Sequence, residues 1–165
     1  MNTQCQTLAE RLRREIAEYG QLLKLFEEQQ KLIFRNAPHY VLESTRAIEA
    51  QVQVLDRERR SREDAVAAFA SGRGQPGAPT LRSLLPFVDD EARPLLKAMI
   101  AEINLLIHRV RRDSRRNHRL LHCVVQCHQE LLRRLRPDAF TKTYAPDGRV
   151  SVAAIRPAAA VQVGG

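Results

Sequence analysis

Apolar residues recur every three or four positions over the first part of the chain, which is the spacing of one face of an α-helix. Either Thr3 or Thr7 could cap this helix, and Glu10 stands three residues after Thr7, as a capping box requires. Gly20 lies inside the pattern and costs up to about 1 kcal/mol there, but the series continues through it. Pro38 predicts a break. The series is Leu8, Leu12, Ile16, Tyr19, Leu23, Phe26 and Ile33.

A second apolar series follows, with Arg59 and Arg62 at two of its positions. Its middle reads DRERRSRED, in which both charge signs occur at helical spacing. This pattern predicts a solvated helix with a thin apolar seam. The segment SGRGQPGAPT, residues 71–80, holds three glycines and two prolines and predicts a loop that reverses the chain. The apolar positions are Leu42, Ile48, Val52, Leu55, Val66 and Phe69, with Thr45 among them.

The last helical pattern is the longest. Thr80 is expected to cap a short turn that ends near Pro86, and Pro94 fits the first turn of the helix that follows. About forty residues then follow a heptad-like repeat, which predicts packing against a partner helix. Asp113 and Asn117 interrupt the apolar seam, where polar residues often fix the register at a cost in stability. The seam is Leu96, Met99, Ile103, Leu106, Val110, Leu121, Val124, His128, Leu131 and Leu135.

These patterns predict an all-α fold in which two or three long antiparallel helices form a coiled-coil-like bundle. We expect a helical domain over residues 1–136, with the loop 71–80 between its halves, and a flexible C-terminal tail over 137–165. The tail has no sustained period, and we find no strand pattern strong enough to build a sheet. A seam of this length could close within one chain or between chains, so the oligomeric state stays open.

Composition and the N-terminal sequence indicate the cellular compartment in which the protein is expected. The first residues, MNTQCQTLAERLRRE, show no signal-peptide pattern. No segment approaches the roughly 18 apolar residues of a membrane helix, so no stable membrane insertion is expected. Three cysteines, an odd number, favour reduced thiols and a cytoplasmic protein.

The segment HRLLHCVVQCH, residues 118–128, contains residue types that bind zinc. In one straight helix, however, His118 and His122 share a face, while Cys123 and Cys127 share a different face. The fifth candidate, His128, falls on the apolar seam. A tetrahedral site would need ligands from a second cluster, which the sequence lacks, so we expect no metal. We also find no phosphate-binding glycine loop and no nucleophile elbow, so the sequence predicts no enzyme and no cofactor.

The net charge of +8 and the basic run HRVRRDSRRNHR, residues 108–119, raise the question of nucleic-acid binding. The arginines spread around the helix, no aromatic residues are interleaved for stacking, and no recognition motif is present. Arginine on the solvent face of long helices is the simpler explanation. We therefore expect no nucleic-acid partner, although a basic nucleic-acid-binding helical protein stays open as an alternative. A structural coiled-coil adaptor without a client is the stronger alternative.

The order of the segments resembles a known family. A Leu- and Glu/Gln-rich first helix (LAERLRREIAEYGQLLKLFEEQQ) precedes the charged LDRERRSRE. A long helix contains NLLIHRVRRDSRRNHRLLHC and ends in Leu-Arg-Pro, and the tail reads TYAPDGRVS. This arrangement is similar to the FlgN family of flagellar type III export chaperones, whose tails carry Tyr, two residues, then Asp-Gly. The agreement in order and spacing is most specific between residues 117 and 151.

The resemblance implies a cytoplasmic, non-exported chaperone. Such proteins bind the hook–filament junction (hook-associated) proteins, prevent their premature aggregation or assembly, and deliver them to the cytoplasmic domain of the export gate protein FlhA. Carried onto this chain, the resemblance implies that Tyr144 docks to the gate and that Asp147 and Gly148 shape the turn beside it. It also implies that the C-terminal helix and tail bind the client, for which the candidates are Leu121, Val124, Leu131, Leu132, Leu135 and Phe140.

Tyr144 is the one large aromatic residue in a polar stretch, which suits an anchor whose pocket belongs to another protein. The alternative is that Tyr144 packs back onto the helices of its own chain. The leucines of the last helix could likewise pair with a client helix or serve the core of this chain.

Overall fold

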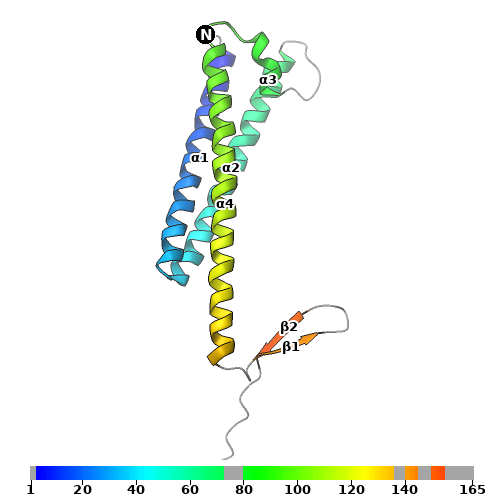
Figure 1. Ribbon diagram of the computed structural model, residues 1–165. Helices are drawn as coiled ribbons and strands as arrows, with labels where there is room; N and C mark the ends of the chain where they lie inside the picture. The colour runs from blue at the N-terminus through cyan, green and yellow to red at the C-terminus, as the bar shows by residue number, and fades with distance from the viewer. Residues whose placement is uncertain (1–2, 73–79, 136–139, 145–149, 155–165) are drawn as a thin grey trace, which may run out of the picture. The chain divides into compact units, whose positions relative to one another are not determined.

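The computed structural model describes residues 3–72 and 80–135, together with two strands near the C-terminus. Its elements are α1 (Thr3–Phe34), α2 (Pro38–Ser71), α3 (Leu81–Leu84), the 3-10 turn η1 (Leu85–Phe87), α4 (Arg93–Leu135), β1 (Phe140–Tyr144) and β2 (Val150–Ala154). The predicted all-α class is confirmed (Figure 1). None of the described helices is long and apolar enough to span a membrane.

The chain divides into two compact units, Met1–Leu120 and Leu121–Gly165. In the first unit, α1, α2 and the N-terminal part of α4 lie side by side around one core (Figure 1). The predicted apolar series supply much of that core, and α3 with its flanking residues covers one end. Its buried residues are Cys5, Leu8, Ala9, Leu12, Tyr19, Val66, Phe69, Ala70, Leu84, Val88, Ala92, Leu96, Met99, Ile103 and Leu106.

The ends of the helices follow local chemistry. Thr7 does not cap α1, because it lies inside the helix and its hydroxyl donates to the Thr3 carbonyl at 3.1 Å. The break at Pro38 is confirmed, and Asn36 adopts the left-handed region with φ of 52° in the turn before it. The cap at Thr80 is confirmed as well: its side chain accepts from the Ser83 amide, and the Ser83 hydroxyl accepts from the Thr80 amide.

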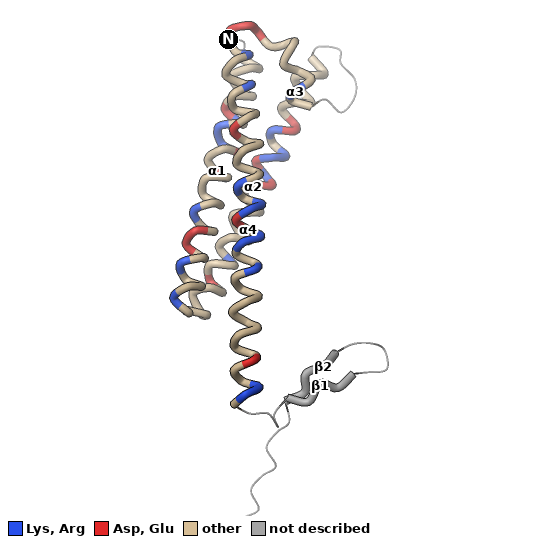
Figure 2. The backbone as a smooth tube through the Cα atoms, viewed as in Figure 1, with Lys and Arg blue, Asp and Glu red and all other residues tan. Residues whose placement is uncertain are grey.

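The second helix has the thin seam that its sequence predicts. Among the residues of α2, which the structure describes in full, Val66, Phe69 and Ala70 are buried. Leu42 and Val52 of the same helix are exposed. Residues of both charge signs follow one another along α2 (Figure 2). Several of these charges pair with each other: Asp56 with Arg59 and Arg60, and Arg59 with Glu63.

One ion pair between α1 and α2 is buried. The Glu15 carboxylate, with 1% of its side chain exposed, accepts from Arg62 Nε at 2.6 Å. Tyr19 lies one helical turn further along α1, and burial, followed by the charge of Glu15, raises the pKa of its hydroxyl, with Arg62 acting in the opposite direction. A second link joins the same helices where Gln51 Nε2 donates to Glu18 Oε2 at 2.6 Å. These polar contacts fix how α2 lies on α1 where apolar burial is scarce.

The Glu15–Arg62 pair predicts unequal effects for two arginines of α2. Replacement Arg62→Ala leaves a buried carboxylate without its partner and should lower the free energy of unfolding by about 3 kcal/mol. Replacement Arg59→Ala is the matched control, because that side chain is half exposed and pairs at the surface, so its loss should stay below about 1 kcal/mol. Urea unfolding followed by circular dichroism measures both. Equal losses would show that the buried pair contributes no more than a surface pair.

A substitution at Gly20 is expected to raise the free energy of unfolding, in contrast to the losses expected at Arg62 and Arg59. The first helix runs through Gly20 without interruption, and a Cβ built there meets no atom within 4 Å. Gly20→Ala should therefore raise the free energy of unfolding by about 0.5–1 kcal/mol, because alanine loses less backbone entropy in a helix. Ala17→Gly, at an exposed position of α1, is the control and should lose a similar amount. An unchanged or lowered stability in Gly20→Ala would contradict the open space at this position.

The expectation that no sheet forms was wrong for ten residues near the C-terminus. Strands β1 and β2 pair antiparallel, with Phe140 opposite Ala154 and Tyr144 opposite Val150. Each strand is five residues long, which is too short to show a clear alternation, although Thr, Tyr and Val favour strands. The Pro-Asp-Gly turn signal at 146–148 lies between them. Most of the predicted loop 71–80 and the rest of the predicted tail 137–165 fall outside the described residues, and the domain boundaries stay a prediction.

A candidate protein-binding surface on α4

The seam of α4 is buried in its N-terminal part. Leu96, Met99, Ile103 and Leu106 belong to the core, with exposed fractions of 9% or less. The burial continues through the two polar positions of the seam. Asp113 is 8% exposed and accepts from Arg112 Nε at 2.9 Å, whereas Asn117 is 2% exposed. The predicted seam is thus confirmed as the packing face of this part of the helix.

Asn117 joins three helices through hydrogen bonds. Its Nδ2 donates to the Phe26 carbonyl and to Gln29 Oε1 of α1, each at 2.9 Å. Gln29 Nε2 in turn donates to Thr45 Oγ1 of α2 at 3.0 Å. Because these side chains can form their hydrogen bonds in only one alignment, the series Asn117–Gln29–Thr45 fixes the register of α4 against α1 and α2. Within the described residues, Asn117 Oδ1 has no hydrogen-bond partner.

Removal of the Asn117 amide should be costly. Asn117→Ala leaves Gln29 Oε1 without its donor in a buried place and should lower the free energy of unfolding by about 1–3 kcal/mol. Ser114→Ala, at an exposed position of the same helix, is the control and should change stability by less than about 0.5 kcal/mol. Urea unfolding measures the free energy of unfolding of both variants. A loss at Asn117 no larger than at Ser114 would mean that the network does not hold the helices.

Beyond Asn117, the seam keeps its apolar character but is no longer buried. Leu121 and Val124 are partly exposed. Val125 is 51%, Leu131 54% and Leu135 69% exposed. The spacing of three and four residues places all of them on one side of α4. We call this set the distal leucine face: Leu121, Val124, Val125, Leu131, Leu132 and Leu135.

Charged side chains of the same segment lie mostly on the other side of α4. Glu130 accepts from Arg133 at 2.7 Å and from Arg134 at 3.1 Å, and each of the three side chains is more than 40% exposed. A shallow open depression next to Leu131 is lined by Gln126, Cys127, Glu130, Leu131 and Arg134. By helical spacing, the exposed His128 falls among the leucines and valines, so the distal leucine face is apolar apart from this one polar residue.

The structure places the predicted site residues in two groups. Five of the predicted client-binding residues share the distal leucine face, and Val125, which sequence analysis missed, joins them because it stands four residues after Leu121. Phe140 and Tyr144 are the first and last residues of β1. Asp147 and Gly148 lie outside the described residues.

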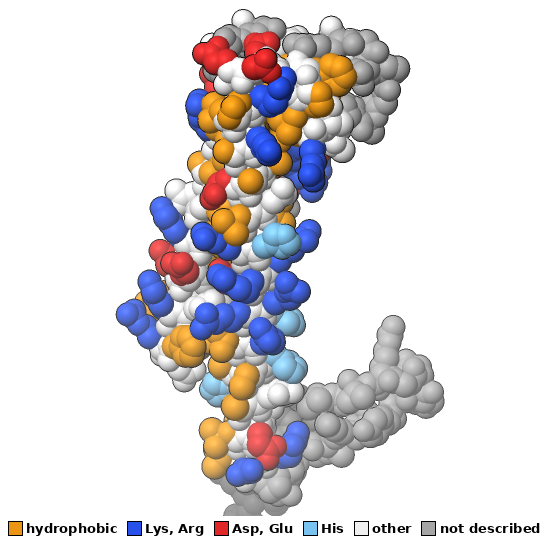
Figure 3. Space-filling model, turned by 45° about the horizontal axis from the view of Figure 1, so that its top comes forward, with side chains coloured by type: hydrophobic (Ala, Val, Ile, Leu, Met, Phe, Trp, Pro, Cys, Tyr) orange, Lys and Arg blue, Asp and Glu red, His pale blue; other side chains and the backbone are white. Residues whose placement is uncertain are grey.

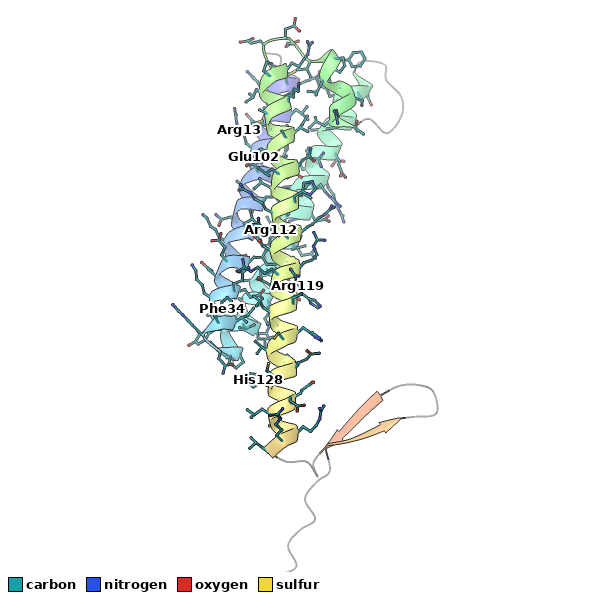
Figure 4. All side chains as sticks on the ribbon, in the orientation of Figure 1. Arg13, Phe34, Glu102, Arg112, Arg119 and His128 are labelled. Atoms are coloured by element: carbon teal, nitrogen blue, oxygen red, sulfur yellow. The ribbon has the colours of Figure 1, made fainter. Side chains whose placement is uncertain are left out.

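The cysteines and histidines of residues 118–128 all lie on α4. Cys123 and Cys127 are exposed free thiols. His128, which also comes from α4 (Figure 4), has its Nδ1 2.9 Å from the Val124 carbonyl oxygen. Over the described part of the chain, no group of three or more His, Cys, Asp or Glu side chains could hold a metal ion.

The structure is thus a helical bundle held in register by polar contacts, with an exposed apolar face towards the C-terminal end of α4. A family model described as FlgN protein matches residues 1–151. The chain therefore belongs to the FlgN family, the flagellar export chaperones for hook-associated proteins. This is a chaperone family and not an enzyme family. The comparisons with curated proteins and with solved structures gave no match.

Proposed function

We propose that this chain is a cytoplasmic chaperone that binds hook-associated proteins before export, prevents their premature aggregation or assembly, and delivers them to the export gate protein FlhA. Membership of the FlgN family supports the general role. The distal leucine face, where the apolar seam of α4 continues after its burial ends, is the observation that carries the assignment of the client site.

The exposure of this face has a cost that a client would relieve. Leu131, Leu132 and Leu135 are 54%, 49% and 69% exposed. Covering such a side chain contributes roughly 1 kcal/mol or more, and contiguous exposed apolar residues typically mark binding sites. Helix α4 is already folded, so little ordering entropy is lost on its side of the interface.

The client segment that fits this face is an amphipathic helix. The face is straight and follows positions three and four residues apart, so a second helix with the same spacing can pack along it. A helical terminus of a hook-associated protein would supply such a segment.

The strands supply the proposed contact with the gate. Tyr144 ends β1 opposite Val150 of β2, so it stands next to the connection that contains Asp147 and Gly148. A two-stranded hairpin is marginally stable alone, and docking onto a larger domain would stabilise it. Tyrosine is favoured at the centre of interfaces because it brings a large contact area with few rotatable bonds. Phe140, at the start of the same strand, is the proposed link between tail and client.

The client site is tested by calorimetric titration of the full chain with the hook-associated proteins of the same organism. Leu131→Ala/Leu135→Ala should weaken binding about 30-fold or more, since both remove central apolar contacts. The control is Gln126→Ala/Gln129→Ala, at exposed positions on other sides of the same segment, which should change affinity less than about threefold. Tyr144→Ala should keep client affinity and lose binding to the FlhA cytoplasmic domain.

Two results would contradict the proposal. If no hook-associated protein binds the wild-type chain, the assignment of the client class fails. If clients bind but both double variants behave alike, the chaperone role survives and the distal leucine face is not the client site.

A further inference from the structure

Helix α4 carries a second exposed stripe within the first unit. Ala98, Ala101 and Leu105 are exposed and follow one another at steps of three and four residues. Arg109, Arg112 and Arg116 continue the same spacing, and all three are exposed. At 3.6 residues per turn, this stripe lies about a third of a turn away from the buried seam. We call Ala98, Ala101, Leu105, Arg109, Arg112 and Arg116 the outer stripe.

The charges of the outer stripe are poorly neutralised. In the described part of the chain, Arg109 and Arg116 have no acidic partner, and Arg112 pairs with Asp113 at 2.9 Å while its side chain stays 70% exposed. On α2, by contrast, the neighbouring Arg59 and Arg60 both pair with Asp56. Like charges three and four residues apart destabilise a helix, so the stripe would gain from acidic groups brought by another molecule.

Basic side chains dominate the surface around the stripe. Lys and Arg side chains gather across the middle of the face in Figure 3. Arg112 and Arg119, both from α4, are labelled in Figure 4. The same part of α4 has a shallow open depression lined by Arg112, Ser114, Arg115, His118 and Arg119. These charges raise the local concentration of an acidic partner before it docks.

We propose that the outer stripe is a docking surface for an acidic amphipathic helix of a second protein partner, separate from the client. The small Ala98 and Ala101 allow close approach of a helix, and Leu105, 45% exposed, gives it an apolar contact. Arg109, Arg112 and Arg116 then receive its carboxylates, which the planar guanidinium binds with two parallel hydrogen bonds.

The order of apolar and basic positions also selects the direction of the partner. An antiparallel helix places its N-terminal half against Arg109–Arg116 and its C-terminal half against Ala98–Leu105. Acidic residues are favoured in the N-terminal part of a helix by the macrodipole. The partner is therefore an antiparallel helix with glutamate or aspartate in its N-terminal half and apolar residues in its C-terminal half.

A nucleic acid fits the stripe less well than an acidic helix. Helix α4 contains no aromatic residue that could stack on a base. Half of the outer stripe is alanine and leucine, which a phosphate backbone does not use. Arginine alone attracts phosphate as well as carboxylate, so a nucleic-acid duplex belongs in the test.

The test uses a fluorescent helical peptide of about 20 residues, long enough to span the stripe, with glutamates in its N-terminal half and leucine and alanine in its C-terminal half. Binding to the full chain is followed by fluorescence anisotropy. Arg109→Gln/Arg116→Gln should weaken binding about tenfold. The control Arg46→Gln/Arg57→Gln removes the same charge from exposed positions of α2 and should weaken it less than about threefold. Circular dichroism confirms that all variants are folded.

Three outcomes would overturn the proposal. Equal loss in the two arginine pairs would mean general attraction of a polyanion. Equal affinity for a peptide with the reversed sequence would remove the proposed direction. Tighter binding of a DNA duplex of the same net charge, lost in Arg109→Gln/Arg116→Gln, would make the stripe a nucleic-acid site.

Discussion

The apolar seam of α4 is the feature on which the rest of the molecule depends, because it is longer than the helices available to cover it. The α4 helix has 43 residues, whereas α1 has 32 and α2 has 34. At 1.5 Å per residue, a shorter helix cannot bury the whole length of α4. The seam therefore serves as core as far as Asn117 and as exposed surface after it.

Polar contacts decide where that division falls. A seam of leucines could slide by a turn with little change in burial, and the second helix offers few buried apolar residues to prevent this. Asn117 with Gln29 and Thr45, and Glu15 with Arg62, can form in one alignment of the three helices. The alignment that they fix sets which residues of α4, as far as Asn117, are buried against α1 and α2.

Helical spacing made most of the bundle predictable from sequence. The stripes that begin at Leu8 and Leu96, the break at Pro38 and the cap at Thr80 depend on local pattern and chemistry, and the structure shows them as expected. The hairpin was missed because five-residue strands give almost no period. The partner of Asn117 was also beyond sequence analysis, since Phe26 and Gln29 lie some ninety positions away and meet it only once the bundle has formed.

The site was predictable in part. Spacing alone grouped Leu121, Val124, Leu131 and Leu135 on one side of a helix, but it could not tell a buried core from an exposed face. That distinction depends on how far the neighbouring helices reach, which is a property of the folded chain. The roles of Phe140 and Tyr144 rest on family resemblance and on their place in β1, so they stay proposals.

Hydrogen exchange of the α4 amides, with and without a bound hook-associated protein, shows whether one helix face is core before Asn117 and client site after it. Residues 121–135 should exchange readily in the free chain and become strongly protected in the complex, while residues 96–117 should be protected in both. Client-induced protection that leaves residues 121–135 unchanged and appears elsewhere in the chain would contradict it.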